Sequence, residues 1–322
     1  MLSRRAFLRT STFAIVTAPW CGEAESSAKV RRVVWFNLGS RNPVVENTLR
    51  DALRHRGWVD GQNLALEWVY AHGNAARLPQ LAQEVVARNV DVIVSAGTTS
   101  IRAAKDATAT IPIVMAGGGD PVGSGLVKSL QRPGENVTGV SLVGQELTEK
   151  TLALLKEATG ARTAALILAA ANPANAFFQQ HTVAAGKKLG VDVTTYDIAG
   201  AHDIERTFAA INADAAYMLI DPLFFIYRDR IAGIALKRKL PLMAAERRYA
   251  ESGFLLTYGS DFFDVLRGAA SFVDRILRGA KPRDLPVEQP TRFDLVVNAK
   301  TAKALGVTLP PSLLLRADKV IE

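Results

Sequence analysis

The hydrophobic pattern of this chain changes period repeatedly after residue 30. Short apolar runs typical of buried strands alternate with stretches in which apolar residues recur every three or four positions, as in amphipathic helices. We predict strands at residues 32–38, 64–69, 91–95, after Pro112, and at 137–143, 164–168, 191–196, 215–220, 241–243, 254–258 and 293–297. Helices are predicted at residues 44–55, 75–88, from 99 to 106, and at 174–189, 225–239 and 261–278. Such alternation predicts an α/β fold with parallel sheets covered on both faces.

The stretch at residues 111–143 divides this series into two halves. Its apolar run ends in three glycines, which are followed by Asp120 and Pro121. Asp is a good N-cap and Pro a good first helical residue, so we expect a short helix to residue 130. The strand at 137–143 then leads directly into a second strand–helix series. The pattern therefore predicts two Rossmann-like lobes that separate near residue 143.

Size and composition narrow the class of protein. A length of 322 residues favours two domains, and 48% hydrophobic residues allow sizeable cores. The net charge of +8 is scattered over predicted helix faces without interleaved aromatic residues, so we expect no nucleic-acid partner. The chain has one cysteine, Cys21, and its four histidines show no metal-ligand spacing. We therefore expect no cofactor, no metal and no internal disulfide.

Motifs of the common enzyme classes are missing from the sequence. The glycines before Asp120 do not complete a dinucleotide-binding GxGxxG pattern, and no GxxxxGK[ST] phosphate loop is present. No GxSxG nucleophile elbow occurs either. The sole cysteine lies in the first 28 residues, which leaves a processed chain without a thiol nucleophile. We therefore expect a protein that is not an enzyme.

The first 28 residues are typical of an export signal. Arg4 and Arg5 precede Phe7 and a short apolar stretch at residues 13–20, too short for a stable membrane span. The paired arginines resemble a twin-arginine signal, while an ordinary secretory signal remains the alternative. Trp20, directly before Cys21, does not suit a lipoprotein signal, so we expect no lipid anchor. These features predict a mature protein outside the cytoplasm, with cleavage after Ala28 or at an earlier site offered by Gly22 and Ala24.

Polar residues follow the predicted strands, at the sheet edge where open α/β folds bind ligands. Hydroxyls and backbone N–H groups at helix N-termini favour a ligand carboxylate, and the acidic residues favour an ammonium group, with Asp221 preferred over Glu246. For Thr98, Asp120 and Asp221 the alternative role is helix capping. The candidate ligand-binding residues are Ser40, Gly97, Thr98, Thr99, Asp120, Ser141, Asn172, Asn175, Asp221, Glu246 and Tyr258.

Three long stretches of the sequence resemble a known family. GDPVGSGLVKSLQRPGENVTGVS, LPVEQPTRFDLVVNAKTAKALG and PPSLLLRADKVIE are similar to segments of extracytoplasmic substrate-binding proteins of ABC importers. The subfamily includes binders of tryptophan and other aromatic amino acids. The resemblance implies the type I periplasmic binding protein fold, a monomer in the periplasm, and delivery of a small ligand to a membrane permease.

The resemblance also implies how the chain divides. An export signal at 1–28 would precede one lobe formed by 29–142 and 259–285, and a second formed by 143–258 and 286–322. Three hinge strands near 141–145, 257–261 and 283–292 would join the lobes, which close on the ligand. A sensor that feeds a signalling receptor, and an exported α/β enzyme, are the alternatives. A transcriptional regulator of this fold does not suit a chain with an export signal in place of a DNA-binding headpiece.

Overall fold

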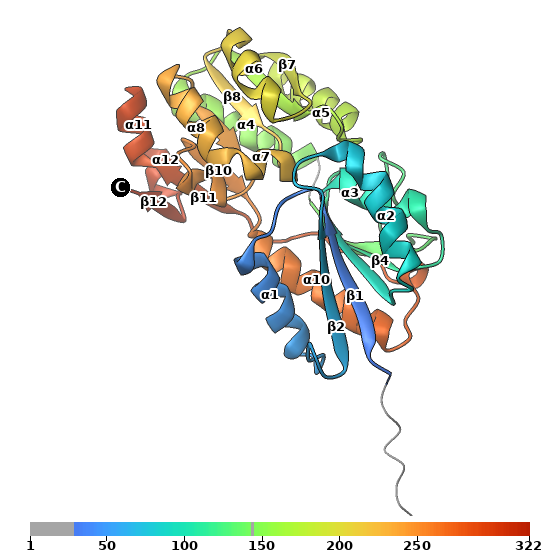
Figure 1. Ribbon diagram of the computed structural model, residues 1–322. Coiled ribbons are helices and arrows are strands. Elements are labelled where there is room, and N and C mark those ends of the chain that lie inside the picture. Colours follow the sequence, from blue (N-terminus) through green and yellow to red (C-terminus); the bar gives the residue numbers. More distant parts are fainter. Residues whose placement is uncertain (1–28, 143–144) are drawn as a thin grey trace, which may run out of the picture.

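The computed structural model describes residues 29–142 and 145–322, which form two lobes (Figure 1). Each lobe is a twisted sheet with helices on both faces, as the alternating pattern predicts. The predicted export signal lies outside the described residues. Within the described ranges, no helix combines the length and the apolar character that crossing a bilayer requires.

The first lobe contains a five-stranded sheet in the order β2-β1-β3-β4-β5, and every neighbouring pair is parallel. Its strands are β1 (Arg31–Asn37), β2 (Leu64–Tyr70), β3 (Val92–Ala96), β4 (Ile113–Gly118) and β5 (Val137–Ser141). Its helices are α1 (Pro43–Arg54), the 3-10 turn η1 (Ala75–Arg77), α2 (Leu78–Ala87), α3 (Thr98–Ala107) and α10 (Phe262–Leu277).

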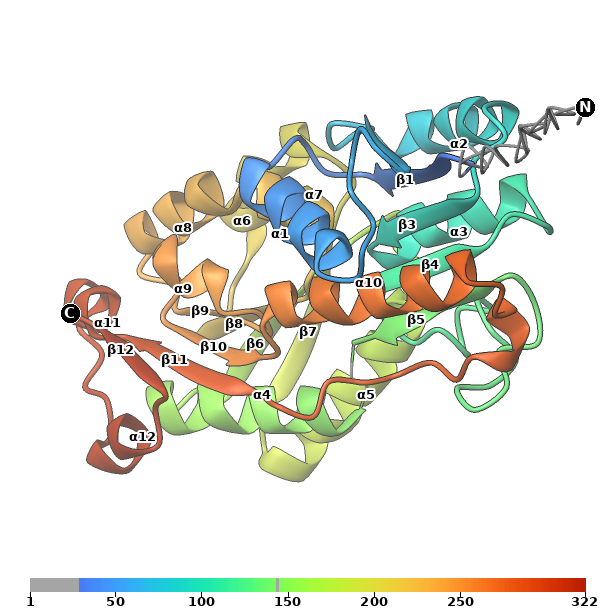
Figure 2. The same ribbon diagram turned by 90° about the horizontal axis from the view of Figure 1, so that it is seen from below.

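The two faces of this sheet are covered by different helices. Along β1, Val33 and Trp35 face a cluster that also includes Leu49 of α1 and Phe272 of α10. Phe36, on the opposite face, belongs to the cluster that includes residues of α2 and α3. Because successive side chains of a strand point to opposite faces, one apolar run supplies both cores. Figure 2 shows α10 lying beside β4 and β5 although it follows β10 in the chain.

The second lobe contains a seven-stranded sheet in the order β12-β11-β10-β9-β8-β6-β7. Its strands are β6 (Thr163–Ala169), β7 (Asp192–Ile198), β8 (Ala215–Met218), β9 (Leu242–Ala244), β10 (Leu256–Gly259), β11 (Asp294–Asn298) and β12 (Lys319–Ile321). Its helices are α4 (Gln145–Thr159), α5 (Asn175–Leu189), η2 (Ala201–Asp203), α6 (Ile204–Ala210), α7 (Pro222–Ile226), α8 (Arg228–Lys237), α9 (Arg248–Glu251), α11 (Ala299–Leu305) and α12 (Pro311–Leu315). The pair β10–β11 is antiparallel, unlike the rest of the sheet. Between these two strands the chain passes through α10 and the 3-10 turn η3 (Pro282–Asp284) and returns from the first lobe.

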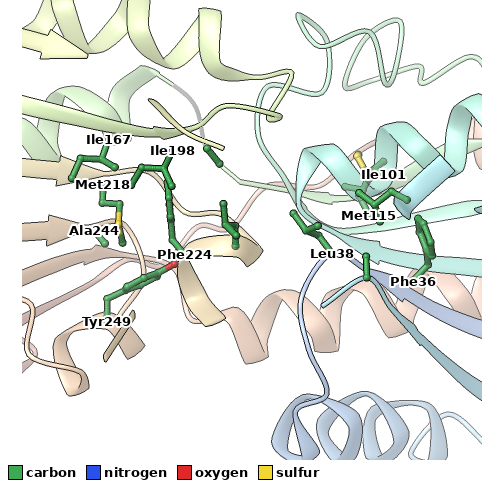
Figure 3. Close-up of a cluster of buried hydrophobic side chains, with 14 of the residues drawn as sticks. Phe36, Leu38, Ile101, Met115, Ile167, Ile198, Met218, Phe224, Ala244 and Tyr249 are labelled. Atoms are coloured by element: carbon green, nitrogen blue, oxygen red, sulfur yellow. The ribbon is translucent and has the colours of Figure 1, made fainter. Parts of the chain in front are cut away.

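Buried apolar residues of both lobes join in one cluster near the boundary between them. Figure 3 shows Leu38 of the first lobe facing the side that carries Phe224 of the second. Both side chains are almost fully buried, as is Tyr249 beyond them. The lobes therefore share apolar contacts in the arrangement that the structure shows.

The chain passes between the lobes three times, after β5, between β10 and α10, and between η3 and β11. The exact divisions differ slightly from those that the resemblance implies. Gly259 pairs with Asp294 in the second sheet, so it lies with the second lobe. Val287 and Glu288 donate backbone hydrogen bonds to Leu130 and Gly139, so the return segment follows the first lobe beyond residue 285.

Two helix predictions were wrong. Residues 121–130 form successive turns instead of a short helix. Asp120 adopts a positive φ of 37°, and its carboxylate accepts a hydrogen bond from the N–H of Gly123, which closes a local turn. The predicted helix at 225–239 is divided into α7 and α8 at Tyr227. The backbone of Tyr227, with a φ of −105° and a ψ of 13°, is not helical.

Candidate functional site

A cavity of about 460 Å³ lies between the two lobes. Its walls come from loops that follow β1, β3 and β4 of the first sheet, and from loops that follow β6, β8 and β9 of the second. All six strands are parallel members of their sheets, and their carboxyl ends are the usual ligand-binding edge of open α/β folds. The volume is in the range typical of small-molecule sites.

Six of the eleven predicted residues line this cavity. They are Ser40, Gly97, Thr98, Asn172, Asp221 and Glu246. Thr99, Asp120, Ser141, Asn175 and Tyr258 do not line it. The structure therefore brings the two acidic candidates together with the glycine turn that precedes α3.

Thr99 lies at the contact between the lobes. Its hydroxyl donates to the carbonyl oxygen of Ala171 in the second lobe, over 3.4 Å. Asp120 holds its own turn, as described above. In this arrangement Thr99 therefore serves the contact between the lobes, and Asp120 serves its local turn.

Ser141, Asn175 and Tyr258 also lie away from the cavity wall. Ser141 is fully buried at the end of β5. Asn175 donates from its amide nitrogen to the carbonyl oxygen of Ala169 over 2.8 Å, and so ties the start of α5 to β6. Tyr258 packs against Phe293, with 6.0 Å between ring centroids, where the chain returns to the second lobe.

Asp221 is buried at the start of α7, with 1% of its surface exposed. One carboxylate oxygen accepts from the backbone N–H of Leu223 over 2.9 Å, and the other accepts from the amide of Asn172 over 3.0 Å. Burial raises the pKa of Asp221 to about 6, and these two hydrogen bonds oppose the rise. Asp221 therefore caps α7 and contributes to the cavity wall at the same time.

Glu246 follows β9 and is 3% exposed. Its Oε1 accepts from the Nε of Arg248 over 2.9 Å and from the backbone N–H of Arg248 over 3.2 Å. Its Oε2 is buried and has no hydrogen-bond partner among the described residues. Burial raises the pKa of Glu246, and the Arg248 guanidinium opposes this shift. An unpartnered carboxylate oxygen at a cavity wall is an available acceptor.

The eleven candidates chosen from the sequence include neither Arg248 nor the aromatic residues of the cavity wall. Arg248 lies in the cavity wall with 15% of its side chain exposed. The aromatic rings in the wall belong to Trp35, Tyr70, Phe178, Tyr217, Phe225 and Phe262. Trp35 sits inside a buried strand and Phe178 in the first turn of α5, positions that predict a core role. Two sequence signals were usable: Arg248 is two residues beyond Glu246, and Phe225 is four residues beyond Asp221.

Two glycines of the first lobe receive side chains of the second lobe. A Cβ built on Gly97 would lie 2.7 and 2.8 Å from Cγ and Cδ of Pro222. A Cβ built on Gly119 would lie 2.7 Å from the ring of Phe178. Carbon atoms in contact are normally separated by 3.5–4.0 Å, so only glycine permits these approaches. We call the Gly97–Pro222 contact the glycine notch, and it places the lobes in a closed arrangement.

Comparison with known proteins gives the family. The family model described as ABC transporter substrate binding protein matches residues 41–321. The chain belongs to this family. The two-lobed architecture of this substrate-binding protein is that of the type I periplasmic binding proteins. Proteins of the family are extracytoplasmic, bind small ligands and deliver them to an ABC permease.

Three relatives of the substrate-binding protein differ in how well they match it. A tyrosine-binding protein of Clostridioides difficile is 28% identical over 259 residues, covering 80% of this chain and 74% of the relative. A Streptococcus structure in complex with L-Trp is 25% identical, with a TM-score of 0.84, and the match covers 90% and 99% of the two chains. A ligand-free, open structure of a substrate-binding protein from Clostridium difficile is 26% identical, covers 91% and 99%, and has a TM-score of only 0.62. At similar identity, this chain therefore matches the L-Trp complex better than the ligand-free, open structure.

Proposed function

We propose that this substrate-binding protein binds an aromatic amino acid in the cavity between its lobes and presents it to a membrane permease. The observation that carries the proposal is the composition of the cavity wall. It contains Glu246, a buried acid with one oxygen free of partners, and Arg248, a half-buried cation, together with six aromatic side chains. An aromatic amino acid needs this combination, because its head group is charged and its side chain is apolar.

The relatives support the same ligand class. One is named for tyrosine and the other was crystallised with L-Trp. We infer that backbone N–H groups at the start of α3, next to Gly97 and Thr98, assist in binding the ligand carboxylate from the first lobe, because the helix dipole favours an anion there. The second lobe contributes the acidic residues. A ligand held by both lobes stabilises the closed state by its higher affinity for that state.

We further propose that residues 1–28 direct export, with Arg4 and Arg5 forming a twin-arginine signal, and that the mature protein acts as a monomer in the periplasm. The two arginines fit that signal, and the family is extracytoplasmic. We infer that the protein releases its ligand chemically unchanged. Recovery of an altered ligand after incubation with the pure protein would contradict this inference.

A thermal-shift screen of the mature protein tests the ligand class. The panel contains L-tryptophan, L-tyrosine, L-phenylalanine, L-leucine, L-glutamate and D-galactose. An aromatic amino acid at about 100 times its dissociation constant should add roughly 2.7 kcal/mol to the stability of the folded state. L-Glutamate and D-galactose should leave the melting temperature unchanged. Stabilisation by D-galactose alone would reject the proposal, and stabilisation by L-leucine alone would replace the aromatic class with an aliphatic one.

A further inference from the structure

Arg248 lies in the cavity wall against aromatic rings from both lobes. Its guanidinium carbon lies 4.0 Å from the ring centroid of Phe225 in α7 of the second lobe. It also lies 4.6 Å from the ring of Phe262 and 5.3 Å from that of Phe263, both at the start of α10. Stacked aromatic rings fix the plane of a guanidinium and limit its hydration. In the closed arrangement, rings of both lobes therefore set the position of this cation.

The contact between Arg248 and Glu246 leaves part of each charged group available. The side-chain hydrogen bond joins only Nε of Arg248 to Oε1 of Glu246. Among the described residues, no hydrogen bond involves the two terminal guanidinium nitrogens of Arg248, and none involves Oε2 of Glu246. Both residues lie in the cavity wall, where Arg248 has two unused donor nitrogens and Glu246 has one buried oxygen without a partner.

We propose that Arg248 and Glu246 together form the head-group site, in which Arg248 binds the carboxylate of an α-amino acid and Glu246 binds its ammonium group. An α-amino acid carries both charges on one carbon, so it needs a donor and an acceptor that are neighbours. A guanidinium matches a carboxylate in a bidentate geometry. This inference rests on the proposed function and assigns the two residues that read the zwitterion.

The other charged residues of the cavity wall are less suited to this task. Asp221 already accepts one hydrogen bond on each carboxylate oxygen. Arg228 donates to the carbonyl oxygen of Phe225 over 2.7 Å, and 30% of its side chain is exposed. Arg41 is 75% exposed and paired with Glu46. Among the described residues of the cavity wall, Glu246 is buried and Arg248 half-buried, and each has polar atoms without a hydrogen-bond partner.

Calorimetry with two sets of matched probes tests the assignment. One set is L-tyrosine, tyramine, which lacks the carboxylate, and 3-(4-hydroxyphenyl)propionate, which lacks the ammonium group. The second set is L-tryptophan, tryptamine and indole-3-propionate. The variants are Glu246→Gln and Arg248→Lys. Glu205→Gln and Arg230→Lys serve as matched controls, because they alter an exposed ion pair of the same lobe outside the cavity wall.

Each variant should lose affinity for the probes that carry the charge it recognises. Glu246→Gln should weaken the amino acid and the amine about ten- to a hundredfold, and leave the deaminated acid nearly unchanged. Arg248→Lys should weaken the amino acid and the acid by a similar factor, and spare the amine. Lysine keeps the charge but loses the bidentate fork. The control variants should bind every probe like the wild type.

The outcomes separate this inference from the proposed function. If the wild type binds an amino acid and both variants bind it equally well, the head-group assignment is wrong while the proposed function stands. Equal losses for all three probes of a set would indicate a damaged cavity and would also overturn the assignment. If the wild type binds none of the six probes, the aromatic amino-acid function itself fails, and the assignment fails with it. Melting curves of each variant confirm that the protein binding the probes is folded.

Discussion

Replacing Gly97 with alanine places a methyl group where the two lobes touch. Its Cβ would lie 2.7 and 2.8 Å from Cγ and Cδ of Pro222, about 1 Å inside an ordinary carbon contact. Overpacking of this kind costs about 1–3 kcal/mol, and here the cost falls on the closed state alone. Backbone strain at the φ of 81° affects the open and closed states equally and therefore cancels. Affinity for L-tryptophan or L-tyrosine should fall about 5- to 150-fold.

A second substitution supplies the control. Within the described part of the chain, and apart from the chain neighbours of Gly97, only Cγ and Cδ of Pro222 lie within 4 Å of the built Cβ. Pro222→Ala removes both atoms and leaves a residue that suits the first position of α7. The double variant Gly97→Ala with Pro222→Ala should therefore recover most of the lost affinity. Neither substitution removes a polar group from the cavity.

Small-angle X-ray scattering and calorimetry provide the readouts. Gly97→Ala should retain a larger radius of gyration than the wild type at equal ligand concentration, and the double variant should contract again. Wild-type affinity and scattering in Gly97→Ala would refute the idea that the glycine notch controls closure. A single variant that binds weakly and is not rescued by Pro222→Ala would show that Gly97 acts on the ligand directly.

Three further predictions concern stability and export. Burial raises the pKa of Asp221 to about 6 in the folded protein, above the value near 3.9 of an unfolded chain, so the folded state binds the proton more tightly. The free energy of unfolding of the wild type should therefore fall by up to about 3 kcal/mol as pH rises from 4 to 7. Urea unfolding should show this loss in the wild type but not in Asp221→Asn. Parallel stability profiles of the two proteins against pH would contradict the prediction. Phe272→Ala, at a fully buried position of α10, should lower the free energy of unfolding in urea by about 3–5 kcal/mol. Val44→Ala, at a position 57% exposed, should change it by less than about 0.5 kcal/mol. Similar losses in both variants would disprove the packing argument. Changing Arg4 and Arg5 together to Lys should leave precursor in the cytoplasm, and a normal yield of exported protein would exclude the twin-arginine route.

Most of the fold could be predicted because its elements are specified locally. The helix expected at 44–55 is α1 (Pro43–Arg54), which begins after an Asn42 cap and buries Leu49 and Leu53 on one face. Local signals failed at Asp120 and Pro121. Gly123 and Gly125 follow closely, and the chain forms turns because nothing in this short segment offsets the low helix propensity of glycine. A single helix start signal therefore predicts an element only when an apolar face follows it.

The cavity could be predicted only in part, since strand ends are visible in a sequence and lobe contacts are not. The position after β9 identified Glu246 as a candidate, and the position after β8 identified Asp221. Arg248 gains its place through rings of α7 and α10, which approach it only in the folded chain. Phe178 reaches the cavity because the second lobe packs against Gly119 of the first. Such residues depend on contacts between distant segments, which no local pattern encodes.

The placement of α10 fixes the order in which the protein can be completed during synthesis. This helix packs on β3, β4 and β5 of the first lobe, yet it is translated after nearly all of the second lobe. Until residue 277 has left the ribosome, the apolar face formed by Val94, Val114 and Ala116 lacks its covering helix. Nascent chains with such exposed surface are prone to aggregate and are substrates for chaperones. The amino-terminal half must therefore be protected while the rest is made, and the first lobe is finished only after most of the second lobe has been synthesised.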